Sequence, residues 1–152
     1  MDALSAALSA VHMTGAIFYN AECTAPWGFA VPPLKRVAHI LAPGTVRLVS
    51  YHLVTEGRAL VRFEGAEEDV PVEAGDLLIS PYGYAHTVRN GAPATLVDSG
   101  DSLGDFLAGG VGTMRVGGGG EMTQFICGYF GCERHADRTF LAGLPTMIKI
   151  GI

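Results

Sequence analysis

The stretch between Gly75 and Asn90 constrains the fold more than any other part of this sequence. Gly75 turns the chain into a short apolar run, and Pro81 ends that run because proline has no backbone N–H to give to a sheet. Gly83 accepts the positive φ that a tight turn requires, and His86 begins a second extended run. The spacing therefore predicts two strands joined by a tight hairpin, with His86 pointing into the protein.

Turn-forming residues punctuate the rest of the chain in the same way. Its 21 glycines and 8 prolines separate many short segments, which is typical of an all-β domain rather than of a helical bundle. The longest strand signal covers residues 46–55, where alternation places Ser50 and His52 on one face. The glycine-rich stretch 99–122 predicts a long loop, and the apolar spacing after Asp2 predicts a short N-terminal helix. Further strands are predicted at residues 15–20, 27–31, 59–63, 70–72, 77–80 and 123–130.

Composition and charge narrow the classes of function. The 152 residues are enough for one domain with a substantial core, and 49% of them are hydrophobic. No apolar stretch approaches the roughly 20 residues that span a bilayer, and the N-terminus lacks the basic region of a secretory signal, so we expect a cytoplasmic protein. The ten lysines and arginines are scattered over a chain of net charge −5, so the chain alone is not expected to bind nucleic acid. The three cysteines are expected to be reduced thiols.

The motif from Gly75 to Asn90 resembles the second signature motif of the cupin β-barrels, a family in which the motif's histidine is a metal ligand. Segments along nearly the whole chain are similar, in order and separation, to the N-terminal cupin domain of AraC-type transcription regulators. These segments are residues 14–18, 25–28, 51–57, 75–86, 117–121 and 127–132. The resemblance implies one all-β domain over residues 1–152, a cupin-type antiparallel β-barrel of the double-stranded β-helix or jelly-roll kind. A short N-terminal helix and a small C-terminal helical segment complete the predicted fold.

The resemblance to AraC-type regulators also implies a function. Domains of this kind sense a small-molecule effector and form homodimers, and a C-terminal pair of helix-turn-helix motifs binds DNA. That DNA-binding half is absent from residues 1–152, so DNA contact is expected only through a domain outside this chain. We therefore expect an effector-sensing or dimerisation domain of a transcription regulator, without membrane contact.

The alternative is a metal-dependent cupin enzyme, similar to a dioxygenase or isomerase, that acts on a small molecule. The first cupin motif of such enzymes supplies two histidines and a glutamate. Here Ser50 occupies the glutamate position, residues 44–46 contain no histidine, and only His86 of the usual ligands is present. An oxygen-activating iron site needs several nitrogen and carboxylate ligands, so the catalytic set is incomplete and no catalytic residue is predicted.

Four residues could nevertheless rebuild a closed zinc site of a structural or sensory kind, namely His52, His86, Cys127 and Cys132. Zinc favours four tetrahedral ligands drawn from histidine and cysteine. Residues five apart on a regular strand face opposite sides, so Cys132 would join Cys127 only through a bulge or turn near Gly128 or Gly131. The alternative for these residues is ordinary core packing, which is common for buried histidine and cysteine.

An apolar effector pocket inside the barrel is the competing interpretation of the same region. Small-molecule pockets are concave and mostly hydrophobic, with a few polar groups in defined places. The residues that could line this pocket are Phe18, Trp27, Ser50, Tyr82 and Tyr129, together with His52 and His86. Aromatic residues of a β-barrel are also common in a plain core, so both roles stay open.

Overall fold

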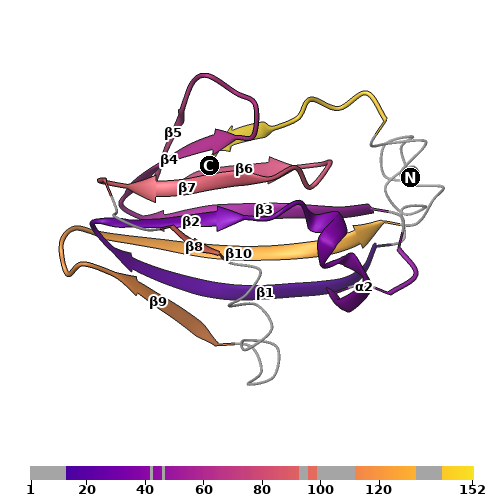
Figure 1. Ribbon diagram of the computed structural model, residues 1–152, viewed down its shortest axis with the longest axis horizontal. Coiled ribbons are helices and arrows are strands. Elements are labelled where there is room, and N and C mark those ends of the chain that lie inside the picture. The colour runs from indigo at the N-terminus through magenta and orange to yellow at the C-terminus, as the bar shows by residue number, and fades with distance from the viewer. Residues whose placement is uncertain (1–12, 42, 46, 93–95, 99–111, 133–141) are drawn as a thin grey trace.

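Two β-sheets face each other across a shared core in the computed structural model of the protein (Figure 1). The structure describes residues 13–41, 43–45, 47–92, 96–98, 112–132 and 142–152. The six-stranded sheet has the order β11 (Ile148–Gly151), β6 (Asp76–Ser80), β3 (Arg47–Glu56), β10 (Met122–Cys132), β1 (Met13–Thr24) and β9 (Thr113–Gly117). The five-stranded sheet has the order β5 (Val70–Glu73), β4 (Arg58–Phe63), β7 (His86–Asn90), β2 (Trp27–Val31) and β8 (Val97–Asp98). Two short helical turns follow β2, η1 (Leu34–Arg36) and α2 (Ala38–Leu41).

Alternating burial along the strands creates the core between the sheets. In β4, Ala59, Val61 and Phe63 are buried, whereas the residues between them are exposed. The six-stranded sheet contributes Val54 and Phe125 to the same core. Burial of a large apolar side chain of this kind contributes roughly 1.5–3 kcal/mol. The predicted all-β, cupin-type fold is therefore confirmed, and the packing of one sheet on the other stabilises it.

Residues 75–90 form the predicted strand, turn and strand, but the turn is not a hairpin. β6 pairs with β3 and β11 in one sheet, whereas β7 pairs with β4 and β2 in the other. Gly83 has a φ of +62°, and a Cβ at this position would lie 2.9 Å from the carbonyl oxygen of Leu48. The backbone N–H of Leu34 donates to the carbonyl of Gly83 at 2.9 Å. This tight turn carries the chain from one sheet to the other and delivers His86 to the start of β7.

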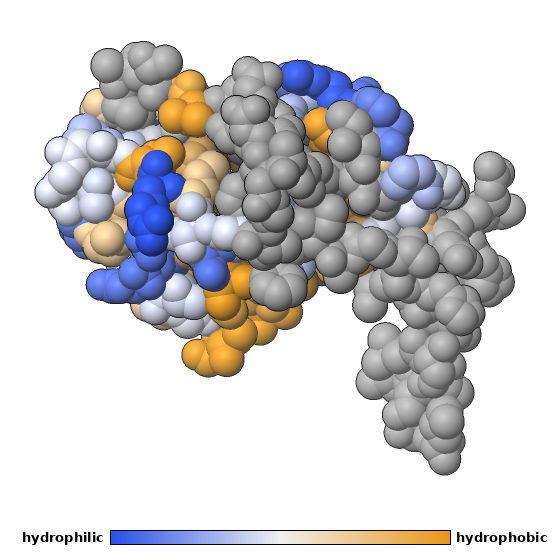
Figure 2. Space-filling view, turned by 90° about the horizontal axis from the view of Figure 1, so that it is seen from below, coloured by the Kyte–Doolittle hydropathy of each residue, from blue (hydrophilic) through white to orange (hydrophobic). Residues whose placement is uncertain are grey.

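β9 departs from the loop predicted for residues 99–122. Residues 113–117 form this strand, which pairs in parallel with β1 and ends the six-stranded sheet. Met114 and Val116 pack against the core and Arg115 is exposed, so a short alternation of apolar and polar residues outweighs the flanking glycines. The surface on the β1 and β9 side of the molecule accordingly carries hydrophilic and apolar residues next to one another (Figure 2).

The ends of the chain differ in what the structure describes. The predicted N-terminal helix falls on residues 1–12, which lie outside the described residues, as do residues 99–111 of the predicted loop. The described C-terminal residues 142–152 contain the strand β11 and no helix, because Ile148 and Ile150 pair with β6. None of the helical segments in the described ranges could span a lipid bilayer.

Candidate functional site

The interior of the barrel brings together His52, His86 and Cys127 from both sheets. Strand alternation points His52 of β3 inward, and the antiparallel register places Cys127 of β10 directly opposite it. His86 begins β7 in the facing sheet, immediately after the turn at Gly83. Each of the three is at most 7% exposed. Three of the four predicted zinc ligands therefore meet inside the protein.

Hydrogen bonds connect these three side chains in a row. Nδ1 of His52 is 3.1 Å from Sγ of Cys127, and Nε2 of His52 is 2.9 Å from Nε2 of His86. Nδ1 of His86 is 3.0 Å from the carbonyl oxygen of Tyr84, which can only accept, so this nitrogen carries a proton. Nε2 of His86 then accepts from Nε2–H of His52, and Nδ1 of His52 accepts from the Cys127 thiol. We call this row of Cys127, His52 and His86 the relay.

Burial keeps every member of the relay uncharged near neutral pH. It lowers the pKa of His52 to about 3, with a further contribution from the neighbouring His86. It also lowers the pKa of His86, against a smaller opposite effect of the Tyr84 carbonyl. The pKa of the Cys127 thiol is raised because the barrel interior disfavours a thiolate. Neutral imidazoles and a protonated thiol are also the forms that the hydrogen-bond pattern requires.

Tyr19 extends the relay toward Tyr129. Its hydroxyl hydrogen-bonds with Cys127 and with Tyr129, and the two tyrosine rings lie 6.3 Å apart. Burial raises the pKa of Tyr129 to about 12 and raises that of Tyr19 as well. The sequence does not single out Tyr19, because its position opposite Cys127 follows only once β1 is paired with β10.

Two buried serines form a second polar spot in the interior. Ser50 of β3 and Ser80 of β6 are register partners, and their exposed fractions are 0% and 2%. Neither hydroxyl has a hydrogen-bond partner among the described residues. A buried hydroxyl without a partner costs about 1–3 kcal/mol, so a water molecule or a ligand group is expected here. Ser50 is one of the predicted pocket residues, whereas Ser80 emerges only from the strand pairing.

The relay does not have the geometry of a metal site. His52 directs its two ring nitrogens at different partners, so His86 and Cys127 lie at different edges of one imidazole. A zinc ion, at about 2.0–2.3 Å from each donor, needs the lone pairs of all ligands to point at one centre. Among the described residues, no group of three or more histidine, cysteine or acidic side chains is arranged to hold a metal ion. The residues present therefore do not fit a zinc ion in this arrangement.

Cys132, the fourth predicted zinc ligand, lies away from the relay. The pairing of β10 with β3 is continuous from Phe125 to Cys132, so no bulge turns Cys132 to the side of Cys127. Cys132 packs with Val49 in a small separate cluster, on the opposite face of the six-stranded sheet. The bulge that a shared zinc site would require is absent from this part of β10.

A comparison with known protein families identifies the family of this chain. A family model described as cupin matches residues 2–151. The chain belongs to the cupin family. Among curated proteins, none matches the sequence.

Matches among solved structures include two proteins of low sequence identity. The protein YhaK from Escherichia coli is 10% identical, with a TM-score of 0.49, and the match covers 96% of this chain and 52% of that one. ToxT from Vibrio cholerae strain SCE256, solved with an unsaturated fatty acid bound, is 5% identical with a TM-score of 0.45, and the match covers 91% of this chain and 41% of that one. The cupin chain thus spans about half the length, or less, of these solved proteins.

A small cavity of about 20 Å³ lies beside the relay, between the two sheets of the cupin domain. Its walls are mostly apolar and consist of Tyr19, Ala21, Phe29, Val31, His52, Val88, Met114, Phe125 and Cys127. A volume of this size holds about one water molecule, whereas small-molecule sites usually measure about 300–1,000 Å³. In this conformation, the cavity is too small for an effector.

Trp27 and Phe18 are both predicted to line the effector pocket, but the structure describes the side chain of Trp27 alone. The ring of Trp27 lies 5.7 Å from that of Phe29 and 5.6 Å from that of Phe125, two residues of the cavity wall. Trp27 therefore packs behind the cavity rather than lining it. The backbone of Phe18 pairs with Gly128 in β1, and its side chain lies outside what the structure describes.

Tyr82, a further predicted pocket residue, lies at the end of the cupin barrel instead of in its interior cavity. Its hydroxyl donates to the carbonyl of Leu144 at 2.6 Å, and the guanidinium of Arg47 lies 4.5 Å from its ring centre. Tyr129 is buried beside Tyr19, behind the wall of the cavity. Two relay residues that were predicted as metal ligands, His52 and Cys127, therefore line the cavity, whereas Trp27, Ser50, Tyr82 and Tyr129 are not part of its wall.

Proposed function

We propose that this cupin domain is the sensing domain of an AraC-type transcription regulator, and that its effector is a small uncharged molecule. The observation that carries the proposal is the relay, an uncharged hydrogen-bond network at the wall of the interior cavity. Apolar residues make up most of the remaining wall, and burying a charged ligand against them would be costly. An uncharged molecule with one or two polar groups fits these walls best.

The relay favours binding over catalysis. A metal-dependent cupin enzyme needs several ligands directed at one ion, with open positions for the substrate. Here both ring nitrogens of His52 and both ring nitrogens of His86 are engaged in hydrogen bonds within the protein. We therefore propose that the domain binds its ligand without converting it.

Effector binding would require the cavity to expand, and β9 is the part of the wall best suited to move. This strand ends the six-stranded sheet, where β1 is its neighbour. Met114 of β9 lines the cavity, and methionine adapts its shape more readily than other apolar side chains. A ligand that binds the expanded state more tightly would shift the domain toward that state.

Ligand binding to matched variants of β9 tests the proposal. Phenol and toluene serve as uncharged probes, and the fluorescence of Trp27, the one tryptophan of the chain, reports binding because it packs against cavity residues. Met114→Phe is expected to abolish binding by filling the cavity. Val116→Phe, on the same strand but outside the cavity wall, should leave binding intact. Equal binding by both variants and the unmodified chain would contradict the proposal.

The enzyme alternative is tested in the same samples. Iron(II) or manganese(II) is added to the purified chain with each probe in air, and oxygen uptake and the probe itself are measured. We expect the probe to be recovered unchanged and oxygen uptake to match that of the metal in buffer. Metal-dependent conversion of the probe would support the enzyme and refute the sensor.

We further propose that the domain forms a homodimer and reaches DNA through a helix-turn-helix half outside this chain. The support is the resemblance of segments such as residues 51–57 and 127–132 to AraC-type sensor domains. Sedimentation equilibrium of the purified chain measures its mass directly. A mass that stays monomeric up to high micromolar concentration would contradict the homodimer.

A further inference from the structure

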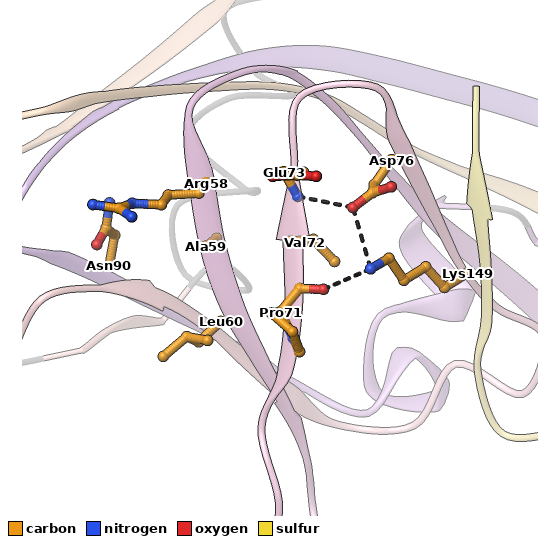
Figure 3. A pocket seen from close by; sticks show the side chains of 9 residues that line it. All are labelled: Arg58, Ala59, Leu60, Pro71, Val72, Glu73, Asp76, Asn90 and Lys149. Atoms are coloured by element: carbon orange, nitrogen blue, oxygen red, sulfur yellow. Dashed lines mark hydrogen bonds and ion pairs between the residues drawn. The ribbon is translucent and has the colours of Figure 1, made fainter.

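A second, open pocket of about 530 Å³ shares no residue with the interior cavity. It lies where β4, β5 and β7 of one sheet approach β6 and β11 of the other (Figure 3). The lining residues are Arg58, Ala59, Leu60, Pro71, Val72, Glu73, Asp76, Asn90 and Lys149. Its volume lies within the usual range of small-molecule sites, about 300–1,000 Å³.

The charges at one end of this pocket are already paired within the protein. The carboxylate of Asp76 accepts from the backbone N–H of Glu73 at 2.9 Å and lies 3.3 Å from Nζ of Lys149. The same ammonium donates to the carbonyl of Pro71 at 2.9 Å. Figure 3 shows Asp76 and Lys149 together at this end, joined by these contacts. This end therefore stabilises the approach of the two sheets, and its ammonium group is already paired and has no free positive charge to offer an anion.

The other end holds donors with weak partners or none. The side chain of Arg58 is 71% exposed, and its guanidinium lies 3.4 Å from the carboxylate of Glu121, which is a long contact for an ion pair. Nδ2 of Asn90 is buried and has no hydrogen-bond partner among the described residues. Trp27 is the register partner of Asn90, and its Nε1 is likewise buried without a hydrogen-bond partner among the described residues. Figure 3 shows Arg58 and Asn90 on the same side of the pocket, away from the paired end.

We propose that this pocket binds a small organic monocarboxylate with an apolar body. The planar guanidinium of Arg58 matches the two oxygens of a carboxylate, and the amide of Asn90 supplies a further donor. The exposed side chains of Leu60 and Pro71 offer the apolar body a surface. Glu73 is exposed at the rim and disfavours a second negative charge on the ligand. The site does not depend on the effector cavity proposed above.

Binding of 3-phenylpropanoate to the purified chain tests this site. The fluorescence of Trp27 reports it because this residue pairs with Asn90 across the strands. The neutral alcohol 3-phenylpropanol lacks the carboxylate, and acetate lacks the apolar body. We expect saturable binding of 3-phenylpropanoate. The affinity for each of the other two compounds should be lower by about tenfold or more.

Variants of exposed charged residues identify the donor. Arg58→Gln is expected to weaken 3-phenylpropanoate binding by about tenfold or more. Arg115→Gln is the matched control, because this arginine of β9 is 70% exposed, pairs with Glu22 at 2.9 Å and does not line the pocket. Glu121→Gln releases Arg58 and should tighten binding by up to about fivefold, a gain that a folding defect could not produce.

Several results would overturn the proposal. Equal affinity of the unmodified chain and Arg58→Gln would remove the guanidinium from the site. Equal affinity for the acid and the alcohol would remove the carboxylate from the ligand class, and a lack of saturation at millimolar concentration would remove the site itself. Met114→Phe is expected to leave this binding unchanged, and its loss in that variant would assign the signal to the interior cavity.

Discussion

Acidification from pH 7 to pH 5 is expected to lower the free energy of unfolding by about 2 kcal/mol through His52 alone. Its pKa is about 3 in the folded protein and 6.5 ordinarily. Because the folded-state pKa is the lower one, the unfolded chain takes up the proton first. The stabilisation is complete above the unfolded pKa and is lost as the pH falls from there toward the folded pKa. Each pH unit in this window costs about 1.4 kcal/mol, and about one and a half units lie above pH 5.

Other groups add to this loss or act outside the window. Burial also lowers the pKa of His86, so its contribution has the same sign and increases the loss. Arg89 and Arg62 lower the pKa of Asp69 to about 2. The stabilisation from Asp69 is therefore present above its usual pKa of about 3.9 and is lost only as the pH falls toward 2, below the tested interval.

Urea unfolding at the two pH values, followed by the fluorescence of Trp27, measures this effect. In His52→Gln the pH-dependent loss should shrink by about 2 kcal/mol, because an amide supplies a donor and an acceptor but does not titrate. His39→Gln is the control, since His39 is exposed on α2 and lies outside the relay. An unmodified chain that is equally stable at both pH values, or a His52→Gln chain that keeps the full loss, would refute the reasoning.

Three further predictions concern particular side chains. Gly57→Ala should lower the free energy of unfolding by about 2 kcal/mol or more, because Gly57 has a φ of +76° and a Cβ would meet the carbonyl of Met122. Gly65→Ala is the control and should cost less, because a Cβ at Gly65 would lie in open space. Tyr82→Phe should cost about 1 kcal/mol in the same urea assay, since it removes the bond to a backbone carbonyl, and an unchanged stability would contradict that bond. The buried thiols should react with a disulfide reagent only after unfolding, and rapid labelling of Cys127 in the native protein would contradict its closed environment.

Much of the barrel could be predicted because its signals are local. Turn residues such as Gly83 and the alternation in residues 46–55 depend only on neighbouring backbone geometry, and they correctly place His52 and His86 inside. The pairing of strands is not local. For that reason, the local signals predict a hairpin where the chain crosses between sheets, and a loop where residues 113–117 form β9.

The chemistry of the site was harder to predict than its location. Residue spacing brings His52, His86 and Cys127 to one region, but it says nothing about which ring nitrogen faces which partner. That choice distinguishes a row of hydrogen bonds from a cage around an ion. The position of Cys132 depended on a bulge that period-2 geometry does not predict, and the register shows a regular strand there. The sequence therefore predicts zinc binding by these four residues, whereas the geometry of the relay predicts that they bind none.

The ring nitrogens of His52 and His86 test the central claim most directly. Their NMR resonances, recorded at neutral pH with and without one equivalent of zinc, report protonation and metal coordination at each nitrogen. We expect each ring to have one protonated and one unprotonated nitrogen, with Nδ1–H on His86 and Nε2–H on His52, and no change on addition of zinc. Doubly protonated rings would contradict the uncharged state of the relay. Zinc-induced shifts at the unprotonated nitrogens would show that these residues form a metal site.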